Sequence, residues 1–304
     1  MCDKHNTQEG PAEGSHTIVS YGEKMTRRTF LPALAATAAA TAAVTAAPAK
    51  GRLKQSVTAG VFRGAKMTLD DMCREAAKLG IYGFDLVKPE DWPILKKHGL
   101  TPTMLPGPFG GTIPDGINSK ENHDRIEKGL REGIDLAAAA GCPNVITLSG
   151  NRRGMPDAEG AGNCVALLDK VKGHAEDKGV TICLELLNSK VNHKDYMCDH
   201  AAWGVDVMKR VNSPRVKLLY DIYHMQIMEG DIVRTIRDNI QYLAHFHTGG
   251  NPGRHEIDAT QELNYRFVAQ AIADLNFGGV VAHEYTPARD PLTSLAQAVE
   301  IFTV

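Results

Sequence analysis

The chain has 304 residues, of which 43% are hydrophobic and 23% are charged. This composition allows a sizeable buried core, either in one large α/β barrel or in two ordinary domains. The formal net charge is −2, so no electrostatic field draws the protein to nucleic acid or to an anionic membrane.

The N-terminus has two parts. Residues 1–24 are polar and lack an apolar period, so we expect a disordered extension. Residues 25–49 have the layout of a twin-arginine export signal, in which Arg27 and Arg28 precede an Ala- and Thr-rich run that ends at Ala47-Pro48-Ala49. Export by this route, with cleavage near Ala49, would place the protein in the periplasm or another space outside the cytoplasm.

The apolar run from Leu31 to Ala47 also raises the alternative of a membrane anchor. It has about 17 residues, mostly Ala and Thr, which is marginal for spanning a bilayer. We therefore expect a cleaved signal and no stable membrane span after processing. The sequence leaves open whether translation starts at Met1 or at Met25.

Residues 50–304 alternate strand-like and helix-like segments, which is typical of βαβ units around a parallel sheet. The expected strands are Ser56–Val61, Tyr82–Val87, Leu100–Leu105, Val145–Ser149, Thr181–Glu185, Val216–Asp221, Tyr242–His247 and Gly279–Glu284. The expected helices are Leu69–Leu79, Glu90–His98, Lys120–Ala140, Asn163–Lys178, Ala201–Val211, Asp231–Asn239, Leu263–Leu275 and Leu292–Phe302. Eight such units over about 250 residues predict a single (β/α)₈ TIM barrel as the catalytic domain.

The six cysteines are widely spaced and form no Cys-x-x-Cys pair. They are Cys2, Cys73, Cys142, Cys164, Cys183 and Cys198. A chain of this length has core enough without disulfides, so we expect free thiols and folding in a reducing compartment.

Four consecutive strands of the expected barrel end in a metal-ligating residue type. These residues are Glu185, Asp221, His247 and Glu284. The active site of such a barrel lies at the carboxyl ends of its strands, and neighbouring strands are about 5 Å apart, so the four side chains converge. A single acidic strand end is more often a helix N-cap or an ion-pair partner, but four at one level are not explained that way. Three carboxylates and one imidazole need a cation, and this donor set suits Mn²⁺, Mg²⁺ or Co²⁺.

Around these strand ends the chain resembles the hydroxypyruvate isomerase group of the xylose isomerase-like TIM-barrel (sugar phosphate isomerase/epimerase) superfamily. The matching segments are CLELLNSKVNHKDYMCDH, KLLYDIYHMQIMEGD, HFHTGGNPGRHEID, AHEYTPARDPL, ENHDRI and ITLSGNRRGM. The resemblance runs from about Lys54 to the C-terminus. It implies that Glu185, Asp221, His247 and Glu284 are metal ligands, that Glu185 and Glu284 also act as acid and base, and that His224 and Arg254 contact substrate oxygens.

The chemistry of an isomerase needs such groups. Isomerising an α-hydroxycarbonyl compound removes a proton from carbon, and a divalent cation stabilises the resulting enediolate. Glu185 and Glu284 can then take and return the proton. His224 would polarise the carbonyl or shuttle a proton, with the alternative that it orients a ligand.

Further cations are candidates for binding a substrate carboxylate or hydroxyl. Lys190 and His193 lie in the loop after Glu185, and Arg254 lies in the loop after His247. Residues 151–153 are similar candidates, although a loop cation is more often simply solvated. The Gly- and Pro-rich loop Pro106–Gly116 is long enough for a lid or a binding role.

The sequence therefore predicts a divalent-metal-dependent isomerase or epimerase of a small hydroxy-ketone, keto acid or sugar. One alternative is a metal-dependent lyase or hydrolase acting on oxidised glycosides, which the export signal favours. Another is a non-catalytic sugar-binding barrel. Phosphodiester cleavage, as in the related endonuclease IV group, would require more His ligands and a basic surface. Analogy with the family also leads us to expect a homo-oligomer.

Overall fold

Eight parallel strands form one sheet in the computed structural model, which describes residues 51–304. The strands are β1 (Lys54–Thr58), β2 (Gly83–Asp85), β3 (Thr101–Met104), β4 (Asn144–Thr147), β5 (Thr181–Glu185), β6 (Val216–Asp221), β7 (Leu243–Thr248) and β8 (Val280–His283). Their hydrogen-bonded order is β3-β2-β1-β8-β7-β6-β5-β4. An isolated parallel bridge between Leu105 and Val145 connects the two ends of this order, so the sheet nearly closes into a barrel.

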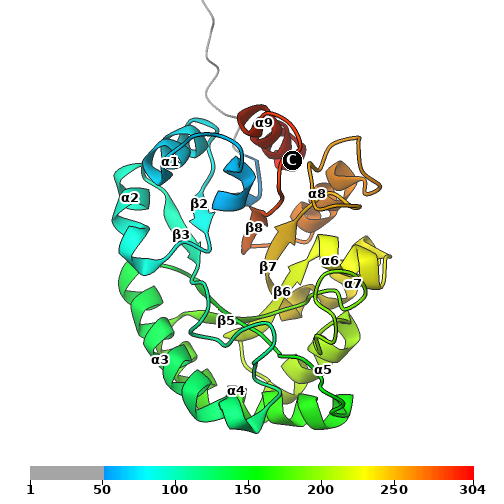
Figure 1. The fold of residues 1–304 in the computed structure, drawn as a ribbon. Helices are drawn as coiled ribbons and strands as arrows, with labels where there is room; N and C mark the ends of the chain where they lie inside the picture. Colours follow the sequence, from blue (N-terminus) through cyan, green and yellow to red (C-terminus); the bar gives the residue numbers. More distant parts are fainter. Residues whose placement is uncertain (1–50) are drawn as a thin grey trace, which may run out of the picture. The chain divides into compact units, whose positions relative to one another are not determined.

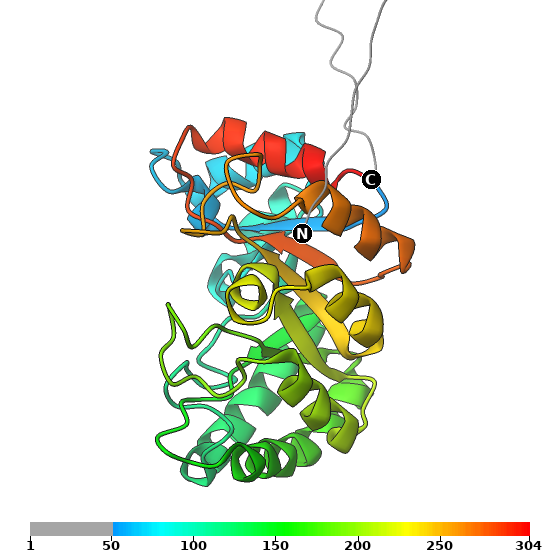
Figure 2. The ribbon, with the colours of Figure 1, turned by 90° about the vertical axis from the view of Figure 1, so that its right-hand side faces the viewer.

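The helices surround the strands (Figure 1). They are α1 (Leu69–Lys78), α2 (Trp92–Lys97), α3 (His123–Ala140), α4 (Asp157–Lys178), α5 (Ala201–Val211), α6 (Ile222–Met228), α7 (Ile232–Asn239), α8 (Tyr265–Asp274) and α9 (Pro291–Phe302). Seen from the side, they lie on the outside of the strands (Figure 2). The predicted TIM barrel is confirmed. The predicted N-terminal extension and export signal lie outside the described residues.

Within residues 51–304, none of the helices combines the length and the apolar character that crossing a membrane requires.

Local sequence signals explain where several elements begin and end. Thr68 caps α1 through a reciprocal pair of hydrogen bonds, in which its hydroxyl accepts from the backbone N–H of Asp71 and the Asp71 carboxylate accepts from the N–H of Thr68. The helix α4 ends at Lys178, and the φ of 69° at the following Gly179 is a left-handed conformation that glycine adopts without strain. The chain reverses there and enters β5 at Thr181, as the sequence predicts.

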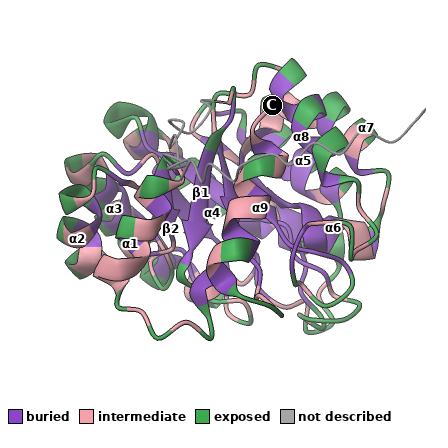
Figure 3. Ribbon diagram, turned by 90° about the horizontal axis from the view of Figure 1, so that it is seen from above, coloured by how far each residue is buried: buried purple, intermediate pink, exposed green. Residues whose placement is uncertain are grey.

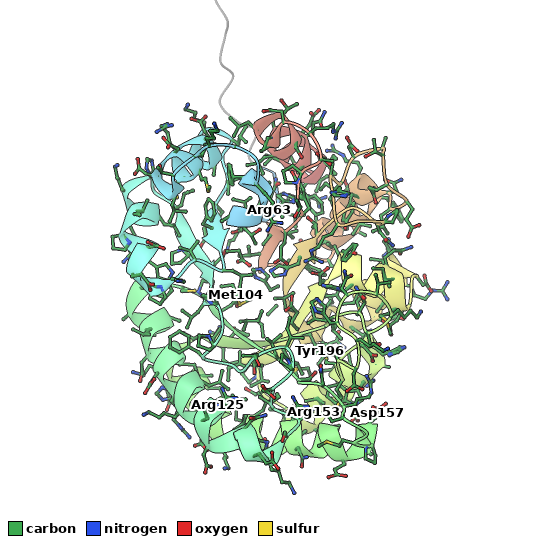
Figure 4. All side chains as sticks on the ribbon, in the orientation of Figure 1. Arg63, Met104, Arg125, Arg153, Asp157 and Tyr196 are labelled. Atoms are coloured by element: carbon green, nitrogen blue, oxygen red, sulfur yellow. The ribbon has the colours of Figure 1, made fainter. Side chains whose placement is uncertain are left out.

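Side chains alternate between the inside and the outside of the barrel. Met104, Ile146, Cys183 and Leu219 pack together as one small cluster inside it, and Met104 lies within the ring of strands in Figure 4. Ile182 and Leu184 belong to the larger cluster between strands and helices. The strands are accordingly buried on both faces (Figure 3). This alternation places Glu185, two residues after Cys183, inside the barrel at its carboxyl end.

Several elements differ from the sequence expectation. β1 ends at Thr58, and the residues expected to continue it form a 3₁₀ turn, Ala59–Phe62. α4 begins at Asp157, six residues before the expected start, with Asp157 and Glu159 favouring its first turn. α6 was not expected, and it begins directly after β6 because the Asp221 carboxylate accepts a hydrogen bond from the N–H of His224.

The loop Pro106–Gly116 packs closely against β4. The Thr147 hydroxyl donates to the carbonyl of Gly110 at 2.9 Å, and the Leu148 N–H donates to the same carbonyl at 3.2 Å. A Cβ atom at Gly110 would lie 2.0 Å from the carbonyl oxygen of Ile146. Glycine is therefore required for this approach.

The expected free thiols are confirmed for the five cysteines at positions 73 and beyond. All five are buried, and burial raises the pKa of Cys73 to about 11 and that of Cys142 to about 12. They are unreactive core residues at neutral pH. Cys2 lies outside the described residues.

Candidate active site

Four side chains from four consecutive strands meet at the carboxyl end of the barrel. Glu185 ends β5, Asp221 ends β6, His247 lies in β7, and Glu284 follows β8 directly. One potential ligand atom from each lies within 4.8 Å of those of the other three. Asp221 and His247 are fully buried, while the Glu284 side chain is 28% exposed. The structure therefore brings together all four residues that the sequence selected as metal ligands.

The imidazole of His247 lies at the centre of this group. Its Nδ1 atom is 2.8 Å from Glu284 Oε2, 3.3 Å from Glu185 Oε1 and 3.8 Å from Asp221 Oδ2. Burial opposes a charge on the ring, but the Glu284 carboxylate and the hydrogen bond with Asp85 outweigh it and raise the pKa of His247 well above its usual range. The site thus favours positive charge at this point.

The three carboxylates experience different environments. Burial raises the pKa of Glu185 above its usual range, against the opposing effect of His247. Burial acts in the same direction on Glu284, but His247 and Arg254 outweigh it and lower the pKa of that carboxyl. Arg254 and His224 likewise hold the pKa of the buried Asp221 well below its usual range. Negative charge is concentrated at the position that the four side chains share.

These residues fit a divalent cation. The Nδ1 atom of His247 is buried and has no hydrogen bond of acceptable geometry, even though it faces three carboxylates. A bound cation would give this nitrogen a partner and would offset the charge of the carboxylates. One imidazole with three carboxylates is a donor set that suits Mn²⁺ or Mg²⁺. The protein therefore contains a buried cluster that could hold a metal ion.

Arg254 lies against the same carboxylates. Its Nη2 atom is 2.6 Å from Asp221 Oδ2 and 2.6 Å from Glu284 Oε2. The guanidinium stacks on the ring of Tyr223 at 4.8 Å, and the backbone of Arg254 has a φ of 56°. Its Nη1 atom is buried and finds no hydrogen-bond partner in residues 51–304. Two carboxylates and the Tyr223 ring therefore fix the position of the Arg254 guanidinium, while its Nη1 donor has no acceptor among the described residues.

His224 lies on α6, one turn after Asp221. Its Nδ1 atom is 2.5 Å from the amide nitrogen of Asn188, and its Nε2 atom is 3.7 Å from Asp221 Oδ2. The Asn188 amide orientation is fixed because its oxygen accepts from the backbone N–H groups of Val191 and Asn192. Burial lowers the pKa of His224 to about 3, so the ring is neutral and carries its proton on Nε2, which faces the site.

The two basic residues of the loop after β5, Lys190 and His193, have different surroundings. The ring of His193 lies 5.1 Å from that of His224, and burial lowers its pKa. Lys190 instead donates from Nζ to the carbonyls of Ile227 at 3.1 Å and Met228 at 2.8 Å, at the end of α6. His193 therefore lies beside the four-residue cluster. Lys190 connects the loop after β5 to the end of α6 by hydrogen bonds.

The cations after β4 are held in ion pairs. Arg152 pairs with Asp199 at 2.8 Å and also donates to the carbonyl of Tyr196, whereas Arg153 pairs with Asp115 at 2.7 Å. Tyr196 in turn donates from its hydroxyl to the carbonyl of Glu185 at 3.0 Å. Figure 4 labels Arg153 and Tyr196 in this region. These contacts brace the loop that follows Glu185.

Sequence reasoning missed several residues that contact the site. Asn188 and Tyr223 contact His224 and Arg254, and Asp85 lies 2.9 Å from His247. Tyr223 directly precedes His224, and Asn188 lies two residues before Lys190, so both are close in sequence to residues that the sequence did select. Asp85 is an acidic residue inside an apolar strand, and that anomaly could have drawn attention to it.

Comparison with known proteins identifies relatives of this chain. The sequence model described as "Xylose isomerase-like TIM barrel" matches residues 73–303. The human protein named "Putative hydroxypyruvate isomerase" is 27% identical over 176 residues, which cover 56% of this chain and 64% of that protein. A 2-oxo-tetronate isomerase from Haemophilus influenzae is 27% identical over 240 residues, covering 74% of this chain and 90% of that protein.

The fold has solved counterparts as well. The crystal structure of an AP endonuclease, family 2, from Brucella melitensis superposes with a TM-score of 0.73 at 24% identity, covering 82% of this chain and 99% of that one. The chain spans less than two thirds of the length of the human relative. The family match covers most of the barrel, including all four residues of the central cluster. The chain therefore belongs to the xylose isomerase-like TIM-barrel family.

Proposed function

We propose that the protein is a divalent-metal-dependent isomerase or epimerase that acts on a small hydroxy-ketone, keto acid or sugar through an enediolate. The observation that carries this proposal is the placement of Glu185 and Glu284, whose oxygens lie 3.3 Å and 2.8 Å from the same atom, His247 Nδ1. Two carboxylates at one small site can remove a proton from a carbon atom and return it. Glu185, Asp221, His247 and Glu284 would hold the metal.

The metal, when bound, would act as a Lewis acid that polarises the substrate carbonyl and offsets the negative charge that develops on its oxygens. Glu185 and Glu284 would move the proton. Arg254 would donate from Nη1, the atom without a partner in the described residues, to a substrate oxygen. His224 would donate from Nε2 to a second oxygen, since Asn188 occupies its Nδ1.

The relatives indicate the class of substrate. The Haemophilus influenzae relative is named a 2-oxo-tetronate isomerase, and the human relative is named for hydroxypyruvate. Both names describe short keto acids with neighbouring hydroxyls. The positive charge of Arg254, with His193 close to His224, suits a substrate of this kind that carries a carboxylate.

The test is a product analysis on protein that has been stripped of metal and then supplied with Mn²⁺ or Mg²⁺. A panel of keto acids, ketoses and oxidised glycosides is incubated with each form, and products are resolved by mass and chromatography. A product of unchanged mass that depends on the metal supports the proposal. Turnover that is equal with and without metal would rule it out.

A second candidate is a metal-dependent lyase or hydrolase of oxidised glycosides, which the sequence of the N-terminal segment favours. We propose that Arg27 and Arg28 direct the chain out of the cytoplasm, where it would act on such substrates. Release of an aglycone in the same assay would identify this reaction. Replacing both arginines by lysine should retain the protein in the cytoplasmic fraction, and unchanged export would contradict the signal.

Two other expectations have direct tests. Assembly into a homo-oligomer stays a prediction, and light scattering of the purified chain checks it. Phosphodiester cleavage is disfavoured because the net charge is −2 and the cluster contains a single histidine. Binding to a DNA duplex that weakens with increasing salt concentration would instead support phosphodiester cleavage.

A further inference from the structure

Asp85 is a buried carboxylate outside the four-residue cluster. It is the last residue of β2 and is 1% exposed. Its Oδ1 atom accepts a hydrogen bond from the Thr103 hydroxyl at 2.5 Å. Its Oδ2 atom lies 2.9 Å from Nε2 of His247 and 3.3 Å from Nε2 of His245. A buried carboxylate requires polar partners, and the partners of Asp85 are side chains of β3 and β7 that point into the barrel.

The contact with His247 uses the ring nitrogen that faces away from the cluster. A carboxylate accepts a hydrogen bond but cannot donate one when ionised, so Asp85 selects the tautomer of His247 that carries a proton on Nε2. A bound cation would displace the proton from Nδ1, which lies 3.3 Å from Glu185 and 2.8 Å from Glu284, and would leave the neutral ring with its proton on Nε2. That is the form of imidazole that binds a metal.

His245 holds Asp85 from the other side. The Asn144 amide nitrogen donates to the carbonyl of Thr103 at 2.9 Å and lies 3.4 Å from Nδ1 of His245. Because an amide nitrogen only donates, it favours the tautomer of His245 with a proton on Nε2, the atom that faces Asp85. The two histidine rings are 5.2 Å apart and nearly perpendicular. Asn144, His245 and Asp85 thus form a chain of contacts that ends at His247.

We propose that Asp85 is a positioning residue of the metal centre, which fixes the tautomer and the ring orientation of His247, and that His245 holds Asp85 in place for this task. This inference rests on the metal dependence proposed above. Asp85, His245 and His247 also offer ligand atoms that lie within 4.8 Å of one another and could hold a metal ion of their own. The carboxylate, however, already has hydrogen bonds with Thr103 and His247 and a longer contact with His245, and a metal there would use the Nε2 atom of His247 that Asp85 contacts.

Calorimetric titration of the full chain with Mn²⁺ tests the proposal. The wild type should bind one ion per chain, and Asp85→Asn, which keeps the shape of the side chain and removes its charge, should bind about 10- to 100-fold more weakly. Thr147→Val is the matched control, since it removes one buried hydrogen bond on β4, to the carbonyl of Gly110. Its affinity should equal that of the wild type. Melting temperatures without metal report on folding in each variant.

The outcomes separate the two proposals. A wild type that binds no Mn²⁺ would overturn the metal-dependent function itself. A wild type that binds one ion, with an Asp85→Asn variant of equal affinity, would overturn the positioning role alone. Two ions per chain in the wild type, of which Asp85→Asn and His245→Leu each lose one, would also overturn it, because Asp85 would then be a ligand.

A spectroscopic measurement distinguishes positioning from general support of the fold. In ¹⁵N–¹H spectra of the Mg²⁺-loaded protein, with His247→Gln used for assignment, His247 should be protonated on Nε2 in the wild type. Asp85→Asn should shift the Nε2–H signal upfield, because the hydrogen bond to a charged carboxylate is lost, and an unchanged chemical shift would contradict the inference.

If Asp85→Asn does not fold, the Mn²⁺ affinities of two variants at His245 test the proposal instead. His245→Gln retains a donor toward Asp85 and should keep wild-type Mn²⁺ affinity, whereas His245→Leu should bind more weakly. Equal affinity of the two variants would overturn the proposal.

Discussion

The amide nitrogen of Asn188 lies 2.5 Å from Nδ1 of His224. Asn188 is fully buried, and its oxygen is occupied by two backbone N–H groups, so it offers the ring a donor and nothing else. This contact determines which nitrogen of His224 carries the proton that faces the substrate. One residue therefore joins the loop after β5 to the residue proposed to bind a substrate oxygen.

Asn188→Asp should lower kcat/KM by about 100-fold while the protein stays folded. The carboxylate can still accept from the two backbone N–H groups, but toward Nδ1 it also accepts, which moves the proton of His224 from Nε2 to Nδ1. The loss follows from the typical contribution of a positioned proton donor, roughly 10²- to 10⁴-fold. Steady-state kinetics and circular dichroism measure both quantities. Unchanged kcat/KM would show that the His224 tautomer has no role in turnover.

Glu185→Gln and Glu284→Gln should each reduce turnover by at least about 100-fold, because a neutral amide can neither take nor return a proton. The exchange of substrate hydrogen with deuterated solvent should fall in parallel. Glu300→Gln, at an exposed site on α9, serves as the control. Wild-type exchange in both active-site variants would exclude these two glutamates as the proton-transfer groups.

The functional residues at the strand ends were predictable for two reasons. Side chains of a barrel strand alternate strictly between the inside and the outside of the barrel, and the active site of such a barrel lies at the carboxyl ends of its strands. Cys183 and Glu185 obey this alternation in β5, and the position of Glu185 follows from its sequence alone. Asp85 was missed for a local reason. The apolar run around it continues to Val87, but Leu86 adopts a φ of 56°, so β2 ends at Asp85 instead.

Contacts between distant loops were beyond the reach of the sequence. Lys190 was expected to rim the pocket, yet its ammonium group satisfies two carbonyls at the end of α6. That helix itself depends on a side-chain cap by Asp221. A residue's charge and its place in a loop do not determine which of several nearby acceptors it will reach.

Removing bound metal should lower thermal stability as well as activity. A ligand that binds only the folded state at 100 times its Kd adds about 2.7 kcal/mol to the free energy of unfolding. Mn²⁺ should therefore raise the Tm of the wild type, and a chelator should reverse the shift. Asp221→Asn removes a charge from the cluster and should show a smaller shift. An equal shift in the wild type and in this variant would place the stabilising ion elsewhere.

The Arg152–Asp199 pair should make stability depend on pH at the acid end. The Asp199 side chain is 5% exposed, and although burial opposes its charge, hydrogen bonds from Arg152, Ser189 and His200 lower its pKa. A group with a lowered folded-state pKa contributes stability above its unfolded pKa of about 3.9. That contribution is lost as the pH falls through the folded value.

Arg152→Ala should accordingly reduce the free energy of unfolding by about 3 kcal/mol at pH 7, since it leaves a buried carboxylate without its main partner. The difference from the wild type should shrink as the pH falls toward 3, where Asp199 becomes neutral in the variant. Arg153→Ala is the matched control because its pair with Asp115 is exposed on both sides, 57% and 47%, and should contribute under about 1 kcal/mol. Denaturant unfolding of the three proteins at both pH values measures these differences. Equal losses for the two arginines at pH 7 would mean that burial of Asp199 does not determine the energy of its ion pair.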